Sequence, residues 1–192
     1  MEELLQTLRD RTLAVEIFRQ VATKISASLV EKTKELVLAR GVETNKIIAV
    51  IILRSGTAFL ESIVTTFSQA PVGVIGLRRD EITLEPQLYY ENLPPIAEDT
   101  TVLIFDPMLA TGGTARALVL RLLALGAEKQ NIYFTGIIAA PLGLERLTEL
   151  IPRDNLIISV IDKELDDKGM IVPGIGDFGD RYFGFNDKAV IT

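Results

Sequence analysis

The hydrophobic and polar residues of this chain follow two patterns, one typical of helices and one typical of strands buried on both faces. Apolar residues recur every four positions from Leu13 to Leu38 with charged residues between them, which predicts an amphipathic helix. Short unbroken apolar runs predict buried strands at Ile47–Leu53, Val72–Leu77, Val102–Phe105, Ile132–Ala139 and Leu156–Ile161. Helical spacing returns between these runs, at Ala58–Phe67, Ala115–Ala127 and Leu142–Leu150. Strands that alternate with helices predict an α/β fold, in which a mainly parallel central sheet is flanked by helices.

Two segments do not fit this alternation. Residues Arg78–Pro95 (RRDEITLEPQLYYENLPP) are charged and interrupted by prolines, which favours a β-arm or loop that leaves the sheet. Residues Asp166–Gly184 (DDKGMIVPGIGDFGDRYFG) are rich in glycine and proline but also carry apolar residues. That mixture is typical of a structured loop over a ligand, and a tight surface connection is the alternative interpretation.

The segment Val102–Thr114 (VLIFDPMLATGGT) joins a predicted strand to a glycine turn and then to a helix. The first turn of a helix offers unpaired N–H groups and a partial positive charge of roughly half a unit, so an anion is expected there. No Lys follows the glycines and the G-x-G-x-x-G spacing is missing, which excludes two common nucleotide motifs. Asp106, at the end of the strand, can accept hydrogen bonds from sugar hydroxyls. A sugar phosphate such as ribose 5-phosphate therefore fits, and an ordinary strand-to-helix turn is the alternative.

Composition and charge narrow the function further. The 192 residues are 48% hydrophobic and 24% charged, which predicts one globular domain over residues 1–192. The formal charge of −6 disfavours nucleic-acid binding, so an anionic ligand must be held locally. The chain has no Cys and no His, which excludes thiolate catalysis and the Ser-His-Asp and Cys-His arrangements. The apolar runs are too short to span a bilayer and the first residues lack a signal-peptide pattern, so we expect a cytosolic protein without a membrane partner.

Five strings along the chain resemble the uracil phosphoribosyltransferase family. They are ILRSG (Ile52–Gly56), GLRRDEITLEP (Gly76–Pro86), DPMLATGGT (Asp106–Thr114), AAPLG (Ala139–Gly143) and IVPGIGDFGDRYFG (Ile171–Gly184). They occur in the family's order and at similar separations. The resemblance implies a type I phosphoribosyltransferase-like fold with a β-arm and a small base-binding hood. It also implies transfer of a phosphoribosyl group from 5-phosphoribosyl 1-pyrophosphate (PRPP) to uracil, which gives UMP and pyrophosphate.

The resemblance implies a PRPP site with three parts. Asp106 meets the ribose hydroxyls, and backbone amides from Ala110 to Thr114 surround the 5-phosphate together with the two Thr hydroxyls. Arg54 belongs to a pyrophosphate-binding turn, and Arg79 on the arm also binds the pyrophosphate as it leaves. The PRPP-binding residues implied in this way are Arg54, Ser55, Gly56, Arg79, Asp106, Pro107, Met108, Leu109, Ala110, Thr111, Gly112, Gly113, Thr114 and Asp177.

The resemblance places uracil on main-chain groups of Ile171, Gly176 and Phe178, with Asp177 facing the ribose or pyrophosphate. Cytosine replaces one carbonyl acceptor of uracil with an amino donor, so a site of this kind can discriminate by roughly 10⁴. Phe178 as an ordinary core residue is the alternative. The catalytic residues implied are Asp106, Asp177 and Arg79. The resemblance also implies Mg²⁺ held mainly through PRPP and water, and a homodimer or higher homo-oligomer.

The chain departs from the family's usual strings at a few positions, namely Ser55, Thr57, Ala58, Phe59, Arg78 and Met170. These residues alter the pyrophosphate-binding turn, the arm and the start of the base-binding string. Two other functions therefore stay open at this point. One is a phosphoribosyltransferase for another base, and the other is a nucleotide-sensing regulator that kept the pocket without turnover.

Overall fold

The fold was obtained as a computed structural model, which describes residues 1–79 and 86–185. The helices are α1 (Glu2–Arg9), α2 (Val15–Ala39), α3 (Leu60–Thr66), α4 (Gly113–Ala124), α5 (Pro141–Thr148) and α6 (Phe178–Phe183). The strands are β1 (Ile47–Leu53), β2 (Val72–Arg79), β3 (Pro86–Asn92), β4 (Thr101–Phe105), β5 (Met108–Leu109), β6 (Ile132–Ala139), β7 (Leu156–Ile161), β8 (Glu164–Leu165) and β9 (Ile171–Val172). Short 3₁₀ turns are η1 (Thr44–Lys46), η2 (Ser55–Phe59), η3 (Lys129–Asn131) and η4 (Arg153–Asn155).

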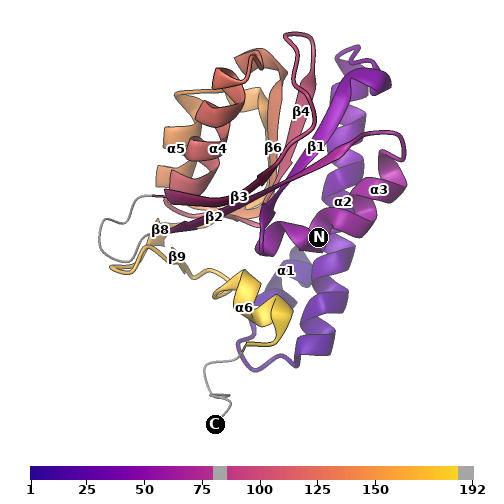
Figure 1. The fold of residues 1–192 in the computed structure, drawn as a ribbon. Helices are drawn as coiled ribbons and strands as arrows, with labels where there is room; N and C mark the ends of the chain where they lie inside the picture. Colours follow the sequence, from indigo (N-terminus) through magenta and orange to yellow (C-terminus); the bar gives the residue numbers. More distant parts are fainter. Residues whose placement is uncertain (80–85, 186–192) are drawn as a thin grey trace.

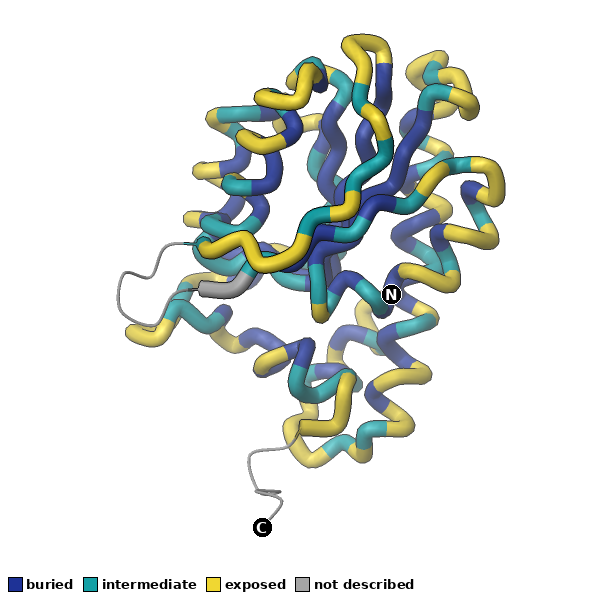
Figure 2. The backbone as a smooth tube through the Cα atoms, viewed as in Figure 1, coloured by how far each residue is buried: buried dark blue, intermediate teal, exposed yellow. Residues whose placement is uncertain are grey.

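The central sheet is parallel except at one edge. Strand β1 pairs with β2 and β4, β4 pairs with β6, and β6 pairs with β7, all in parallel. Strand β5 continues β4 along the same side of β6, whereas β3 is antiparallel to β2 and forms an exposed edge (Figure 2). Helices α2 and α3 cover one face of the sheet, and α4 and α5 cover the other (Figure 1). The predicted α/β fold is confirmed.

The two covered faces explain why strand β1 is apolar at every position. Ile47 and Ile51 pack into the core beneath α2 and α3, whereas Ile48 and Ile52 pack into the core beneath α4. All four side chains are at most 5% exposed. Successive side chains of a strand point to opposite faces, so a strand with two covered faces has no polar position.

The strand pattern breaks where β4 leads into β5. The carbonyl of Pro107 accepts hydrogen bonds from the N–H groups of both Ile137 and Ile138, each at 3.0 Å. The carbonyl of Pro107 thus binds two consecutive N–H groups, but the register is the same before and after it, with Phe105 opposite Thr135 and Met108 opposite Ile138. The hydrogen-bond pattern is therefore interrupted without an extra residue in either strand. Asp106 lies at this interruption, where its N–H still donates to the carbonyl of Thr135 at 3.1 Å.

Side chains beyond this interruption lie on the faces opposite to those that strict alternation predicts. Phe105 packs beneath α2, so Met108 would pack beneath α4 in an uninterrupted strand. Met108 instead packs against the core beneath α2, and Leu109 packs into the core beneath α4. The interruption at Pro107 thus reverses the alternation immediately before the glycine turn.

The structure differs from the predicted elements near the first strand. The predicted helix over Ala58–Phe67 is instead the 3₁₀ turn η2 followed by α3, and α1 was not predicted. A Cβ on Gly56 of η2 would lie only 2.7 Å from the carbonyl oxygen of Phe105. The turn is therefore wound tightly against the end of β4. Across residues 1–79 and 86–185, no helix is both long enough and apolar enough to cross a membrane.

The two segments that broke the sequence pattern form the arm and the hood. Strands β2 and β3 make an antiparallel pair, and residues 80–85 between them lie outside the described residues. Strands β8 and β9 also pair antiparallel, and α6 follows them. We call the segment from β8 to α6 the hood. It lies beyond the carboxyl ends of the parallel strands, beside α1 and the beginning of α2 (Figure 1).

Candidate active site

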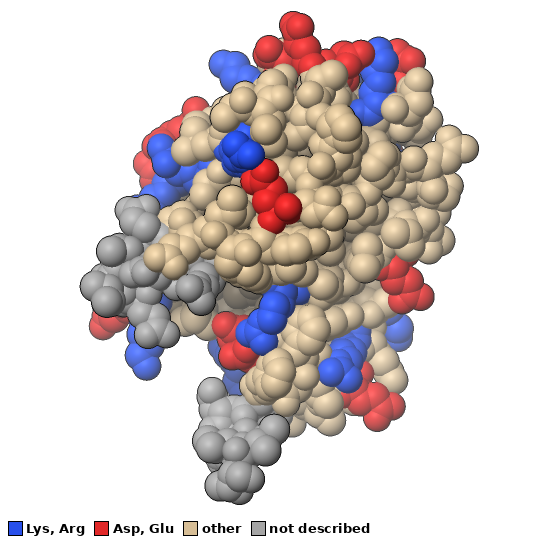
Figure 3. All heavy atoms as spheres, viewed as in Figure 1, with Lys and Arg blue, Asp and Glu red and all other residues tan. Residues whose placement is uncertain are grey.

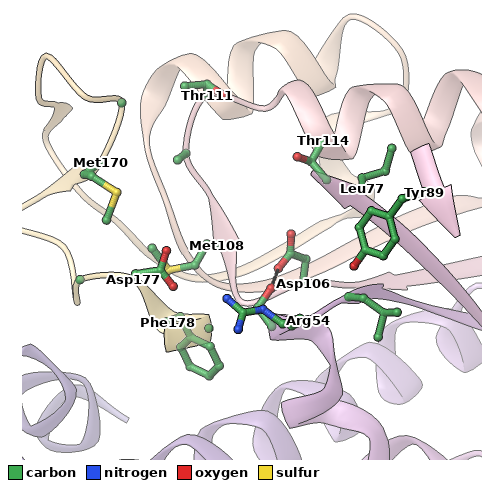
Figure 4. A pocket seen from close by; sticks show the side chains of 16 residues that line it. Arg54, Leu77, Tyr89, Asp106, Met108, Thr111, Thr114, Met170, Asp177 and Phe178 are labelled. Atoms are coloured by element: carbon green, nitrogen blue, oxygen red, sulfur yellow. Dashed lines mark hydrogen bonds between the residues drawn. The ribbon is translucent and has the colours of Figure 1, made fainter. Parts of the chain in front are cut away.

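A cavity of about 640 Å³ opens between the carboxyl ends of the strands and the hood (Figure 4). Its lining residues come from the sheet and arm (Leu53, Arg54, Ser55, Leu77, Tyr89, Asp106), from the glycine turn (Met108, Ala110, Thr111, Thr114) and from the hood (Gly169, Met170, Gly176, Asp177, Phe178, Gly179). Most of these residues belong to the PRPP and uracil sites that the resemblance implied. The structure therefore brings residues from distant strings to one cavity.

The glycine turn forms the amino end of helix α4. Gly112 is the N-cap residue and has a left-handed backbone with φ of 79°, a conformation that favours glycine. The side chains of Thr111 and Thr114 face the cavity on either side of it (Figure 4). The first N–H groups of a helix have no acceptor within the helix, and the helix dipole makes them attractive to anions. The turn can therefore bind a phosphate group.

Asp106 is a buried carboxylate beneath this turn, with 7% of its surface exposed. Burial raises its pKa to about 6, and repulsion from Asp177 acts in the same direction. Hydrogen bonds from the hydroxyl of Ser55, at 2.7 Å, and from the N–H of Met108 act in the opposite direction. Near neutral pH the carboxylate is mostly ionised and can accept hydrogen bonds from sugar hydroxyls.

Arg54 is an exposed cation at the mouth of the cavity. It follows Leu53 through a cis peptide bond, and its Nη2 lies 2.7 Å from Oδ1 of Asp180 in the hood. Its guanidinium also lies over the rings of Phe183 and Phe185, 5.7 Å and 5.4 Å from their centroids. The cation that the resemblance assigns to pyrophosphate is thus paired with a hood carboxylate.

Asp177 and Phe178 begin helix α6 at the hood side of the cavity. The Oδ1 atom of Asp177 accepts a hydrogen bond from the N–H of Asp180 at 2.8 Å, which caps the helix. The ring of Phe178 is 1% exposed and packs 5.6 Å from Tyr182 and 5.3 Å from Phe18. It points away from the cavity (Figure 4), so the core interpretation holds for the ring. The main chain of Phe178 stays at the cavity wall.

Several residues of the implied site do not line the cavity. Ile171 lies in β9, and its side chain is 3% exposed within the core. The side chain of Arg79, and also that of Arg78, lies outside the described residues, although the backbone of both belongs to β2. The other residues lie in or beneath the two turns, namely Gly56, Pro107, Leu109, Gly112 and Gly113.

Three glycines from different elements lie against the backbone of the segment that carries Asp106 and the glycine turn. A Cβ would lie 2.7 Å from the oxygen of Phe105 at Gly56, 2.9 Å from that of Asp106 at Gly136, and 2.6 Å from that of Ala110 at Gly143. These distances leave no room for a side chain. Arg146 of α5 adds a hydrogen bond of 3.0 Å to the carbonyl of Thr111. Helix α5 therefore supports the backbone of the glycine turn, and η2 and β6 support the end of β4 just before it.

Sequence analysis missed part of the cavity and its support. Tyr89 of β3 lies against Gly76, where a Cβ would lie 2.5 Å from the ring. A glycine within a strand often marks such a close approach, and this was the available signal. Gly143 and Arg146 of α5 support the glycine turn. The AAPLG string includes the start of this helix, but it did not indicate that role. Met170, one of the departures from the family pattern, lines the cavity (Figure 4).

Charged side chains lie in small mixed groups over the face shown in Figure 3, separated by uncharged surface. The groups that could hold an anion here are therefore local N–H groups and individual arginines such as Arg54. Of the described residues that line the cavity, Asp106 and Asp177 are acidic. Within the described residues, no group of three or more His, Cys, Asp or Glu side chains is arranged to hold a metal ion.

A mainly parallel sheet with a glycine turn after an acidic strand end, covered by a hood, is the arrangement of a type I phosphoribosyltransferase. A purine phosphoribosyltransferase from Pyrococcus horikoshii shares this fold with a TM-score of 0.54 and 17% identity, covering 75% of this chain and 87% of that one. The family model described as uracil phosphoribosyltransferase matches residues 1–185. The chain belongs to the uracil phosphoribosyltransferase family.

Two further relatives cover nearly the whole chain. A uracil phosphoribosyltransferase from Dictyoglomus turgidum is 39% identical over 198 aligned residues, covering 96% of this chain and 95% of that protein. A solved structure of a protein from Aquifex aeolicus is 31% identical with a TM-score of 0.85, covering 97% of this chain and 95% of that one. The similarity thus includes the arm, the glycine turn and the hood together.

Proposed function

We propose that this protein transfers the phosphoribosyl group of PRPP to uracil and releases pyrophosphate. One observation carries the proposal. A single cavity joins the amino end of α4, the buried carboxylate of Asp106 and the main chain of the hood. The amino end of α4 suits a phosphate, the carboxylate of Asp106 suits a ribose, and the main chain of the hood suits a base. The family membership and the names of the relatives support the same reaction.

The 5-phosphate and ribose occupy the sheet side of the cavity in this proposal. Free N–H groups of residues 110–114 bind the phosphate, and the hydroxyls of Thr111 and Thr114 add hydrogen bonds. The carboxylate of Asp106 accepts hydrogen bonds from the ribose hydroxyls. Because it is buried, its negative charge also interacts strongly with positive charge that develops on the sugar.

Pyrophosphate leaves toward Arg54 and Arg79 in this proposal. Arg54 releases Asp180 and binds phosphate oxygens with its planar pair of donors. The bond from the anomeric carbon to pyrophosphate breaks as the uracil nitrogen forms its bond to the same carbon. The nitrogen proton leaves to water or to the exposed carboxylate of Asp177. Holding both reactants in line supplies much of the acceleration.

The base occupies the hood side. Main-chain groups of Gly176 and Phe178 pair with the polar edge of uracil, and main-chain recognition is possible because the ring of Phe178 is directed into the core. Met170 and Met108 provide flexible apolar surface near this edge. Ile171 acts through the backbone that leads into this loop.

We further propose that the reaction uses Mg²⁺ bound with PRPP. The cavity offers the carboxylates of Asp106 and Asp177, whose hard oxygen atoms suit Mg²⁺. Two carboxylates do not form a complete cage, and this fits an ion that keeps its water and the phosphates of PRPP as ligands. The bound ion supplies charge neutralisation of pyrophosphate. Asp177, directly or through water, is the residue proposed to contact it.

The remaining proposed partner is a second copy of the chain, in a homo-oligomer. The exposed strand β3 carries apolar side chains that support this proposal, with Leu88 50% and Tyr90 45% exposed. Light scattering of the purified protein measures the oligomeric state. A monomer at micromolar concentration would contradict it.

A base-competition assay tests the proposed function. Purified protein is incubated with PRPP and an equal mixture of uracil, cytosine, adenine and guanine, with and without Mg²⁺. We expect UMP as the main nucleotide and little product without Mg²⁺. A different nucleotide would indicate a phosphoribosyltransferase for another base. Absence of pyrophosphate release in all mixtures would indicate a binding protein without turnover.

A further inference from the structure

The hood is tied to the sheet by an ion pair that lies outside the cavity. Asp162 directly follows β7, and its N–H donates to the carbonyl of Ala139 at 2.8 Å, which extends the pairing of β6 and β7. Its carboxylate pairs with Arg9, the last residue of α1. Nη2 of Arg9 lies 2.6 Å from Oδ1 of Asp162, and Nη1 lies 2.8 Å from Oδ2. Neither residue lines the cavity.

The same ion pair holds both backbone groups of Gly174. The N–H of Gly174 donates to Oδ2 of Asp162 at 2.7 Å, and its carbonyl accepts a hydrogen bond from Nη1 of Arg9 at 2.9 Å. Gly176, the next cavity-lining residue along the chain, is only two residues further on. A shift of Gly174 would therefore move the main chain that faces the base.

A second arginine also anchors the loop to the end of α1. Arg181 of α6 donates to the carbonyl of Ile175 at 2.6 Å, and also to the carbonyls of Leu8 and Asp10. Its guanidinium carbon lies 4.2 Å from the centroid of the Phe18 ring. The end of α1 and the start of α2 thus form the support on which the base-facing loop rests.

Burial makes the pair of Arg9 and Asp162 sensitive to substitution. Their side chains are 18% and 4% exposed. Burial alone would raise the pKa of Asp162, but the hydrogen bonds from Arg9 and from the N–H of Gly174 hold it below its ordinary value. Removal of either partner leaves an uncompensated buried group, and Lys cannot reproduce the two parallel contacts of the guanidinium.

We propose that Arg9 and Asp162 are positioning residues that fix the backbone of Gly174 and thereby set the affinity of the hood for the base. The pair contacts the loop and not the glycine turn, so its loss weakens uracil binding more than PRPP binding. This inference rests on the proposed function.

The test compares Arg9→Met with a matched control, Arg40→Met. Arg40 follows α2 and donates to Oδ1 of Asn155 at 2.6 Å and to the carbonyl of Asp154 at 3.0 Å. It therefore also joins a helix end to a side-chain oxygen and a backbone carbonyl, but at the amino ends of β6 and β7, away from the hood. Both variants are measured for thermal stability, kcat, KM for uracil and KM for PRPP. Arg9→Lys and Asp162→Asn are measured in the same way.

We expect Arg9→Met to lower kcat/KM for uracil by about 100-fold, the scale of an effect from misplaced binding groups. The KM for PRPP should change by less than about twofold, and Arg40→Met should destabilise the protein without changing KM for uracil. Arg9→Lys, which keeps the charge and folds more readily, should lie between the wild type and Arg9→Met. Asp162→Asn should reproduce the effect on uracil.

The possible failures are distinct. If the wild-type protein forms no UMP, the proposed function is wrong and this inference falls with it. If the wild type is active and Arg9→Met, Arg9→Lys and Asp162→Asn leave KM for uracil unchanged, only the inference is overturned. The inference is also overturned if KM for uracil and KM for PRPP change equally, or if Arg40→Met changes KM for uracil as much as Arg9→Met does.

Discussion

Two aspartates follow strands of the same sheet, yet their surroundings push their pKa values in opposite directions. Asp106, after β4, is buried beside the neutral hydroxyl of Ser55, and burial raises its pKa to about 6. Asp162, after β7, is also buried, but the guanidinium of Arg9 holds its pKa below the ordinary value. Among the described side chains, no cation pairs with Asp106, and this is the carboxylate that faces the cavity. The carboxylate of Asp106 can therefore accept hydrogen bonds from a ligand, whereas that of Asp162 already binds Arg9 and the N–H of Gly174.

The carboxylate of Asp106 is predicted to be required in its ionised form. Asp106→Asn keeps an acceptor for Ser55 but removes the charge, so kcat/KM for PRPP should fall by about 100-fold at pH 8, as when an active-site charge interaction is lost. Because the pKa of Asp106 is about 6, the ratio of wild-type to variant activity should decrease as the pH falls below that value. PRPP phosphates titrate in the same range in both proteins, so the ratio isolates Asp106. A ratio independent of pH would contradict this role.

The contact between Arg54 and Asp180 is predicted to compete with PRPP. Both side chains are about half exposed, at 52% and 40%, so the ion pair itself is weak. Asp180→Asn frees the guanidinium and should lower KM for PRPP by about twofold to fivefold, as measured by initial rates at low ionic strength. Asp99→Asn, which removes an exposed ion pair with Lys46, is the control and should leave KM unchanged. A higher KM in Asp180→Asn would show that the contact assists binding instead.

The position of the glycine turn depends on the packing of neighbouring elements more than on the sequence of the turn itself. Helix α5 approaches so closely that Gly143 lies against the carbonyls of Leu109 and Ala110. The surroundings of Gly113 are open, and a Cβ there would meet nothing closer than 3.8 Å. We therefore expect the two glycines to serve different purposes, the first for packing and the second for ligand access.

A pair of alanine substitutions should separate these purposes. Gly143→Ala places a Cβ 2.6 Å from the carbonyl oxygen of Ala110, so it should lower both the melting temperature and the affinity for PRPP. Gly113→Ala should leave the melting temperature unchanged or higher, because Ala favours helices, and should weaken PRPP binding alone. Glu145→Ala, at an exposed position of α5, is the control. Equal loss of stability in both glycine variants would contradict the assignment.

The strands and the main helices could be predicted from the sequence because apolar runs and helical spacing report burial directly. The run Ile47–Leu53 coincides with β1, and α2 begins and ends within two residues of its prediction. Helix α1 was missed although its sequence carries a helical signal, with Glu2 and Glu3 in the first turn and buried Leu5 and Leu8 three positions apart. Its contacts with the hood, through Arg9 and Arg181, join distant residues and could not be predicted from this pattern. The interruption at Pro107 was missed because it depends on hydrogen bonds from Ile137 and Ile138 of β6, which lie about 30 positions away in the sequence.

The candidate site was predictable to the extent that it resides in continuous strings. The glycine turn, Asp106, Arg54 and the loop Gly176–Phe178 all reach one cavity. The strings could not indicate which part of each residue is buried and which part lies at the cavity. Nor could they show that Asp180 pairs with Arg54, because that contact joins residues 126 positions apart.

For the whole molecule, the two buried aspartates should shape the pH dependence of stability in opposite ways. The folded-state pKa of Asp106 is raised, so its contribution is favourable below about pH 4 and is lost as the pH rises through about 6. The folded-state pKa of Asp162 is lowered, so its contribution is present above its ordinary pKa and is lost as the pH falls below it. Ionisation of Asp106 therefore limits stability in neutral solution, and protonation of Asp162 limits it in acid.

Urea unfolding of matched variants at several pH values measures these contributions. Asp106→Asn should be more stable than the wild type at about pH 8, by up to about 3 kcal/mol, and equal to it at about pH 4. Asp162→Asn should be less stable than the wild type at neutral pH, with the difference narrowing in acid. A stabilising effect of Asp162→Asn at neutral pH would mean that its ion pair does not repay the cost of burial.

The interrupted hydrogen-bond pattern at Pro107 also limits how this site can be reused in protein design. A graft of Asp106–Thr114 onto another parallel sheet would transfer the residues of the candidate site without the strand pairing that orients them. The recipient strand must present two N–H groups to one carbonyl, as Ile137 and Ile138 do, and a glycine where Gly136 approaches Asp106. The smallest transferable unit is therefore a pair of neighbouring strands with matched irregularities, and a single motif copied alone would point its carboxylate in the wrong direction.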